Sequence, residues 1–120
     1  MFEYKAEIKR VVDGDTYDLE VDLGFKIKHT IRVRLAGIDT PEYYKPRCPL
    51  ERAHAEAAIL FVEKEIAEEG GSVMIHTSEN KGKYGRYIAS IHYGDEYQYD
   101  LTMQLVANGF EKQERYTDEP

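Results

Sequence analysis

The sequence predicts an α+β fold that is mainly β, namely a closed five-stranded Greek-key barrel with a long helix after the third strand and a short C-terminal helix. Alternating apolar and polar residues mark the strands. Helical periodicity replaces this alternation between Pro49 and Gly70 and again after Asp100. A chain of 120 residues is enough for one hydrophobic core, so we expect a single domain.

The first three strands follow from alternation and one turn. Residues 3–12 form the first strand, and Gly24 marks the turn between Thr16–Leu23 and Lys26–Leu35. In each of the latter two segments one face is apolar and the other is polar or charged. The expected inward-facing residues are Tyr17, Leu19, Val21, Leu23, Ile31, Val33 and Leu35.

The long helix has clear boundary residues. It begins at Cys48-Pro49, with proline in the first turn, and ends at Gly70-Gly71. Its apolar stripe is expected to consist of Ala55, Ala58, Ile59, Val62 and Ile66.

Two further strands complete the expected barrel. They are Val73–Thr77 and Arg86–Tyr93, joined by a polar loop, and Asp100 then caps a short helix that stops near Asn108-Gly109. Five strands grouped around one long helix are typical of the oligonucleotide-binding (OB) fold. We therefore assign residues 1–112 to one OB-fold domain and expect residues 113–120 to be a frayed tail.

The charge distribution limits the classes of function. The net charge of −7 argues against a nonspecific nucleic-acid coat. Residues 1–48 nevertheless balance nine basic against nine acidic side chains, so the acidic excess lies in residues 49–120. An enzyme that binds its substrate at one local site is compatible with this distribution.

The sequence also gives expectations about location. No apolar run is long enough to span a membrane, and the first residues do not have the pattern of a secretory signal. Cys48 is the single cysteine, which excludes a disulfide within the chain. We expect a cytoplasmic monomer without membrane association.

Two aspartates form a candidate metal site. Asp15 shares the parity of Tyr17 and Leu19, so a regular strand directs its carboxylate toward the core side of the barrel mouth. Asp39 ends the third strand and can approach Asp15 if the second and third strands pair. Two carboxylates and a backbone carbonyl suit a hard cation such as calcium or magnesium rather than zinc.

Other residues could act on a phosphodiester held by that cation. Arg34 and Arg86 could neutralise charge on the phosphate, and Glu42 could take a proton from water or position it. Tyr84 could stack on a base or hydrogen-bond to a phosphate.

Each motif alone has a structural explanation. Asp-Gly-Asp-Thr is usually a turn, and Arg34 alone could lie on the exposed face of a strand. His29, His76 and His92 lie on separate predicted strands and favour structural roles over zinc binding. Tyr43-Tyr44 could line a substrate or cover the barrel rim, and the sequence does not choose between these.

The motifs occur together in the order of one known family. Asp13–Thr16, Arg34–Glu42 and Lys83–Arg86 match motifs of the staphylococcal nuclease (thermonuclease) family without a gap inside any of them. The chain resembles that family from residue 3 to about residue 112. The resemblance implies an OB-fold barrel and calcium-dependent endonuclease cleavage of DNA and RNA, which leaves 3′-phosphate ends.

The resemblance also implies a ligand set. Asp15, Asp39 and the carbonyl of Thr40 would bind calcium or another hard divalent cation, and Asp13 would lie just outside the direct ligands.

The remaining motif residues would contact the substrate. Arg34 and Arg86 would clamp the phosphate, and Glu42 would activate water. Lys83 and Tyr84 would contact the nucleotide, with single-stranded DNA or RNA as the favoured partner.

Two alternatives to catalysis remain. A noncatalytic nuclease-like OB module could bind nucleic acid or protein, although such modules lack the catalytic residues that this sequence has. A plain single-strand binder would need a basic groove, for which the net charge gives no support.

Overall fold

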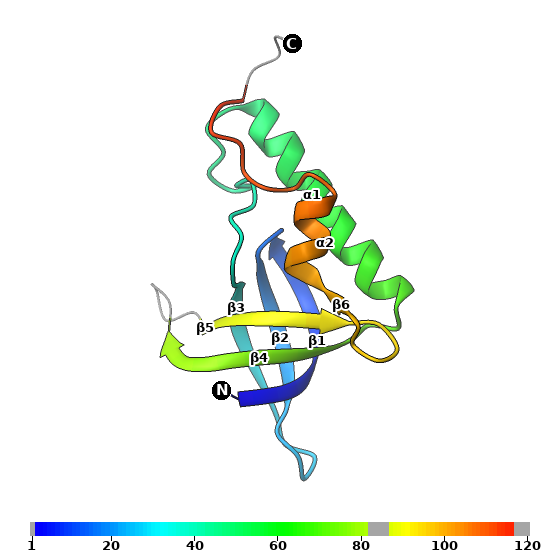
Figure 1. Cartoon of the computed structure of the whole chain (residues 1–120). Coiled ribbons are helices and arrows are strands. Elements are labelled where there is room, and N and C mark those ends of the chain that lie inside the picture. The colour runs from blue at the N-terminus through cyan, green and yellow to red at the C-terminus, as the bar shows by residue number, and fades with distance from the viewer. Residues whose placement is uncertain (1, 82–86, 117–120) are drawn as a thin grey trace.

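The computed structural model describes residues 2–81 and 87–116, and it has strands and helices in the predicted order (Figure 1). The elements are β1 (Phe2–Asp13), β2 (Thr16–Asp22), β3 (Lys28–Leu35), α1 (Pro49–Glu68), β4 (Ser72–Lys81), β5 (Tyr87–Tyr93), β6 (Tyr99–Asp100) and α2 (Leu101–Ala107).

The predicted five-stranded barrel is confirmed. Strands follow the order β3-β2-β1-β4-β5 through antiparallel pairs, and a parallel pairing of β3 with β5 closes the sheet. The two-residue strand β6 is an addition that pairs with β5. Strand β4 also continues to Lys81, beyond the predicted end at Thr77, because it still pairs with β5 after an irregularity in register.

The barrel interior contains the residues that alternation predicts. Tyr17, Leu19, Val33 and Leu35 are fully or almost fully buried. Leu23 differs, with 46% exposure, because it lies beyond the end of β2 in the connection to β3. Inward-facing side chains of the strands therefore make the core, which Leu101 and Leu105 of α2 also join.

Helix α1 packs against the barrel through a narrow stripe. Cys48 is its N-cap residue and Pro49 its first residue, as predicted. Of the predicted stripe, Ile59 is only half-buried, whereas Glu51 is fully buried and extends the stripe by one turn. None of the described helices has the length and apolarity needed to cross a membrane.

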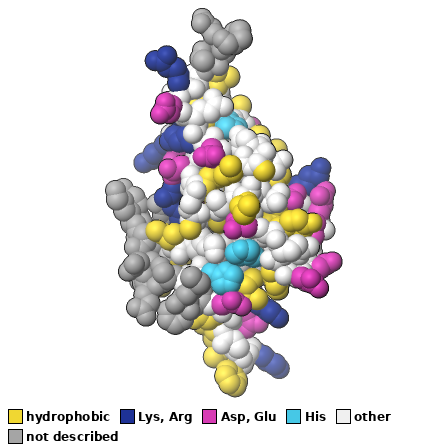
Figure 2. Space-filling model, viewed as in Figure 1, with side chains coloured by type: hydrophobic (Ala, Val, Ile, Leu, Met, Phe, Trp, Pro, Cys, Tyr) yellow, Lys and Arg dark blue, Asp and Glu magenta, His cyan; other side chains and the backbone are white. Residues whose placement is uncertain are grey.

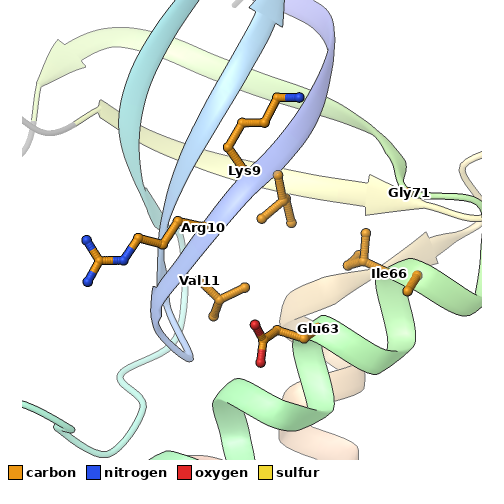
Figure 3. Close-up of a pocket in the computed structure, with 8 residues that line it drawn as sticks. Lys9, Arg10, Val11, Glu63, Ile66 and Gly71 are labelled. Carbon is orange, nitrogen blue, oxygen red and sulfur yellow. The ribbon is translucent and has the colours of Figure 1, made fainter.

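An open cavity of about 240 Å³ lies between β1 and α1 (Figure 3). Val11 and Ile66 line it, with Glu63 at the helix side. Arg10 extends to the opposite side of β1, away from Val11 (Figure 3). The cavity shares no lining residue with the predicted metal and catalytic residues.

The β1–β2 turn packs tightly against α1 and the segment after β3. A Cβ atom at Gly14 would lie 2.9 Å from Thr40 Oγ1 and 3.0 Å from Ala58 Cβ. Thr40 and Ala58 are both buried, so neither has open space into which to move.

We therefore expect Gly14→Ala to lower the free energy of unfolding by about 1–3 kcal/mol through overpacking. Urea unfolding measures this change. If space were present, the same substitution would stabilise the protein by restricting the unfolded chain. An unchanged or raised unfolding midpoint would therefore contradict the packing described here.

Candidate active site

Asp15 lies where the sequence predicts, at the rim of the barrel beside β2. It is 8% exposed. Its carboxylate accepts hydrogen bonds from the backbone amide of Thr40 and from the hydroxyl of Thr16, both at 3.1 Å. These bonds offset the cost of burying the charge and tie the end of β1–β2 to the segment after β3.

Arg34 joins the two predicted metal ligands. The β2–β3 register pairs Thr16 with Arg34, which places the arginine next to Asp15. Its Nη2 atom lies 3.6 Å from Asp15 Oδ2 and donates a hydrogen bond to Asp39 Oδ1. The structure thus brings Asp15, Arg34 and Asp39 together, as the sequence predicts if these strands pair.

The donor set at this rim fits a hard cation. The carboxylates of Asp15 and Asp39 both contact Nη2 of Arg34. A cation bound between the two carboxylates would replace the electrostatic attraction that Arg34 now provides. Thr40 Oγ1 is buried without a hydrogen-bond partner beside them. Within residues 2–81 and 87–116, no three His, Cys, Asp or Glu residues form a metal cluster, so backbone carbonyls and water would complete the coordination.

Glu42 lies on the segment between β3 and α1, and its backbone is held by a carboxylate that the sequence analysis missed. Glu51 has no exposed side-chain surface. It accepts hydrogen bonds from the backbone amide of Glu42 at 3.0 Å and from the backbone amide and Nε of Arg47 at 2.8 and 2.9 Å. Lys112 Nζ lies 3.6 Å away.

The environment of Glu51 favours its charged form. Burial alone would raise the pKa of this carboxyl, but the amides of Glu42 and Arg47, the Arg47 side chain and Lys112 together lower the pKa from 4.5 to about 2. Glu51 is therefore a buried anion that organises the segment carrying Glu42.

The C-terminal segment also contacts the rim. The backbone amide of Lys112 donates to the carbonyl of Asp39 at 2.8 Å. The guanidinium of Arg47 donates to the carbonyls of Gln113 and Glu114. Lys112 and Arg47 therefore connect this segment to both Asp39 and Glu51.

The segment makes further contacts with α1 through His54. Its Nδ1 atom lies 2.9 Å from the hydroxyl of Tyr116, and its Nε2 atom lies 2.8 Å from the carbonyl of Gly109. Residues 113–116 belong to the tail that we predicted to fray, yet they are held by these bonds and by those of Arg47.

Asp13 also supports the segment after β3. Its Oδ1 atom accepts a hydrogen bond at 3.0 Å from the backbone amide of Tyr43, next to Glu42. Asp13 and Glu51 thus hold consecutive amides of this segment from opposite elements, β1 and α1.

A cavity of about 540 Å³ opens beside the rim and can accommodate a substrate. Its lining comes from the β3 end, the segment that follows, β5 and the C-terminal segment: Arg34, Leu35, Ala36, Gly37, Ile38, Asp39, Ile88, Glu111 and Lys112. Lys83, Tyr84 and Arg86, which we predicted to contact the substrate, lie outside the described residues.

The histidines of β4 and β5 form a separate group on the outer face. The ring centroids of His76 and His92 are 5.1 Å apart, because the separate strands that carry them, β4 and β5, pair in the sheet. His76 Nε2 lies 2.8 Å from Glu3, and His92 Nε2 lies 3.7 Å from Asp100. Figure 2 shows adjoining histidine side chains with acidic groups beside them.

Comparison with known proteins assigns the family. The family model described as staphylococcal nuclease homologue matches residues 32–119. The chain belongs to this family.

Named relatives agree with this assignment. The chain is 38% identical to a thermonuclease of Staphylococcus intermedius over 89 residues, which cover 74% of this chain and 49% of that protein. It is 30% identical to a micrococcal nuclease of Shigella flexneri over 112 residues, which cover 93% of this chain and 56% of that protein. The chain thus spans about half the length of these nucleases.

The residue range that the family model matches includes only some of the proposed site residues. The matched range contains Arg34, Asp39, Thr40 and Glu42, whereas Asp15 precedes it. Asp15 is placed beside the matched residues by the β2–β3 register and by the hydrogen bond that its carboxylate accepts from the backbone amide of Thr40.

We expect Glu51→Gln to lower the free energy of unfolding at neutral pH by about 2–3 kcal/mol, because charge-assisted hydrogen bonds to a buried anion are lost. The pKa of Glu51 is lower in the folded than in the unfolded protein, so its stabilisation is complete above pH 4.5 and is lost as the pH falls toward about 2. The deficit of the variant should shrink across that range in urea unfolding.

Glu56→Gln is the matched control because Glu56 is exposed on the same helix. Two results would contradict the role of Glu51 as a buried anion. One is a free energy of unfolding in Glu51→Gln equal to that of the wild type at neutral pH, and the other is a difference between the two proteins that stays constant from neutral pH to pH 2.

Proposed function

We propose that this chain is a metal-dependent nuclease that hydrolyses phosphodiester bonds in single-stranded DNA and RNA and leaves 3′-phosphate ends. The observation that carries the proposal is the convergence of Asp15 and Asp39 on Arg34 at the barrel rim, beside a cavity of about 540 Å³. Membership of a family with named nucleases supports the same reaction class.

The proposed metal ligands are Asp15, Asp39 and the carbonyl of Thr40. Calcium is the proposed ion, and other hard divalent cations suit the same oxygen donors. When bound, such an ion polarises a phosphate oxygen and orients the attacking water. Asp15 is held in place by Thr16 and Thr40, so its carboxylate is already oriented for this task.

Arg34 would bind the phosphate. Its side chain is 33% exposed and borders the cavity, so it is accessible to a ligand while Asp15 and Asp39 orient it. A guanidinium can donate two parallel hydrogen bonds to a phosphate, and it stabilises the charge that develops in the transition state. Arg86 is proposed as the second phosphate ligand from its place in the sequence motif alone.

Glu42 would accept a proton from the attacking water or position that water. Its side chain is half-buried, and its backbone amide is held by a hydrogen bond to the Glu51 carboxylate. The position of Glu42 therefore depends on α1, although Glu42 itself lies outside any helix or strand. Lys83 and Tyr84 are proposed as nucleotide contacts from the sequence motif.

Cleavage of fluorescent single-stranded DNA and RNA, with calcium and with a chelator, tests the proposal. We expect calcium-dependent cleavage, and Arg34→Ala should lower kcat by a factor on the order of 10²–10³ because an electrostatic contact to the transition state is lost. Lys28→Ala is the control, since Lys28 is an exposed cation on the same strand.

Full activity of Arg34→Ala would remove this residue from the mechanism. Binding of the oligonucleotide without cleavage by the wild type would instead identify a noncatalytic OB module.

The metal ligands have a separate test. We expect Asp15→Asn to weaken calcium binding at least about tenfold, because a charged oxygen donor becomes a neutral amide. Calorimetric titration of calcium measures this without any substrate. Asp18→Asn is the control, because Asp18 lies on β2, close in sequence to Asp15, and pairs with Arg32 at 2.8 Å. Equal calcium affinity in Asp15→Asn and the wild type would exclude Asp15 as a ligand.

A further inference from the structure

Two tyrosines and two arginines form a cluster next to the proposed active site. We call Arg10, Tyr43, Tyr44 and Arg52 the tyrosine cluster. Arg10 Nη2 donates a hydrogen bond to the Tyr44 hydroxyl at 2.8 Å, and the Arg52 guanidinium carbon lies 4.8 Å from the centre of the Tyr43 ring. The cluster joins β1, the segment after β3 and α1 in one surface.

The rings of the cluster are held in an ordered arrangement. Tyr43 and Tyr44 contact edge to face, with centroids 5.0 Å apart and an angle of 84° between the ring planes. Arg52 covers Tyr43, and the backbone of Tyr43 is bonded to Asp13. Tyr44 is 58% exposed, so a large part of its ring faces solvent. An exposed ring with fixed supports can bind a flat ligand with little loss of conformational entropy.

The charges of the cluster favour an anion. In the part of the chain that the structure describes, neither Arg10 nor Arg52 forms an ion pair, whereas Arg32, Arg34 and Arg47 each pair with a carboxylate. Arg10 and Arg52 instead contact the tyrosine side chains, so both positive charges remain near the rings in a chain of net charge −7. Arg10 is exposed and extends to the side of β1 opposite Val11 (Figure 3).

The position of the cluster connects it to the proposed chemistry. Tyr43 follows Glu42 directly, and its amide is bound by Asp13, two residues before Asp15. A strand whose phosphate lies at Arg34 could therefore continue onto this surface.

We propose that the tyrosine cluster is a subsite for an unpaired nucleotide, in which a base stacks on Tyr44 and Arg10 binds the adjoining phosphate. The subsite rests on the proposed nuclease function and specifies its substrate as single-stranded, because a base within a duplex cannot expose its face to a side chain. Base stacking on aromatic residues and backbone contacts from arginine are the usual basis of single-strand binding. An acidic polypeptide would satisfy the charges but would leave the exposed ring without a partner.

The test is fluorescence anisotropy with labelled oligo(dT) in the presence of chelator, so that binding is measured without cleavage. We expect Tyr44→Ala to weaken binding at least about fivefold. Tyr44→Phe should stay within about twofold of the wild type, because the ring remains. Arg10→Ala should weaken binding and reduce its dependence on salt by about one phosphate contact.

Two control variants match these changes elsewhere on the surface. Phe25→Ala removes a ring that is 97% exposed in the β2–β3 turn, and Lys64→Ala removes an exposed cation of α1. Both should bind like the wild type. Tyr44→Ala should bind labelled duplex DNA with the same affinity as the wild type. Unlabelled polyglutamate should compete poorly with oligo(dT) for the wild type.

The proposal is overturned if Tyr44→Ala binds oligo(dT) as Phe25→Ala does, if the wild type does not bind it, or if polyglutamate competes equally well. Failure of the nuclease proposal is distinguished from failure of the subsite by comparing cleavage with binding. A protein that binds through Tyr44 but never cuts would retain the subsite and lose the catalytic function, whereas a protein that cuts with unchanged binding in Tyr44→Ala would lose only the subsite.

Discussion

The arrangement of the proposed active site depends on the hydrogen bonds that the buried carboxylate of Glu51 accepts. The segment between β3 and α1 has no helix or strand to order it, yet it carries Glu42. Glu51 supplies two acceptor oxygens to two backbone amides of that segment, those of Glu42 and Arg47, and a countercharge to Lys112. Removing a carboxylate from water is costly, and this number of donors is what offsets the cost.

The barrel supplies the second constraint. Asp15 and Arg34 meet because β2 pairs with β3 in one register, and a slip of one residue would turn every side chain of a strand to the other face. The closing pair of β3 with β5 then brings the rim of β3 next to Ile88, which borders the cavity. Asp15 and Arg34 thus meet through strand pairing, and Asp39 joins them through the side chain of Arg34. The Glu42 segment is held by side-chain hydrogen bonds.

Much of this arrangement could be predicted from the sequence. Alternation located the strands and the buried side of Asp15. Asp39 was expected to end the third strand, but β3 ends at Leu35 and Asp39 lies in the segment that follows. Glu51 was missed because acidic residues on a helix are normally exposed, although its spacing of four residues before Ala55 placed it on the buried stripe. The attachment of Gln113 by Arg47 joins residues 66 apart, and no local pattern encodes such a contact.

The most direct measurement is amide hydrogen exchange of Glu42 and Arg47, compared between the wild type and Glu51→Ala. The account predicts that both amides are protected in the wild type, that both exchange rapidly in the variant, and that Ile75 in the barrel core stays protected in both proteins. Exchange of Glu42 and Arg47 at the rate of solvent-exposed amides in the wild type would contradict the claim that a buried carboxylate orders this segment.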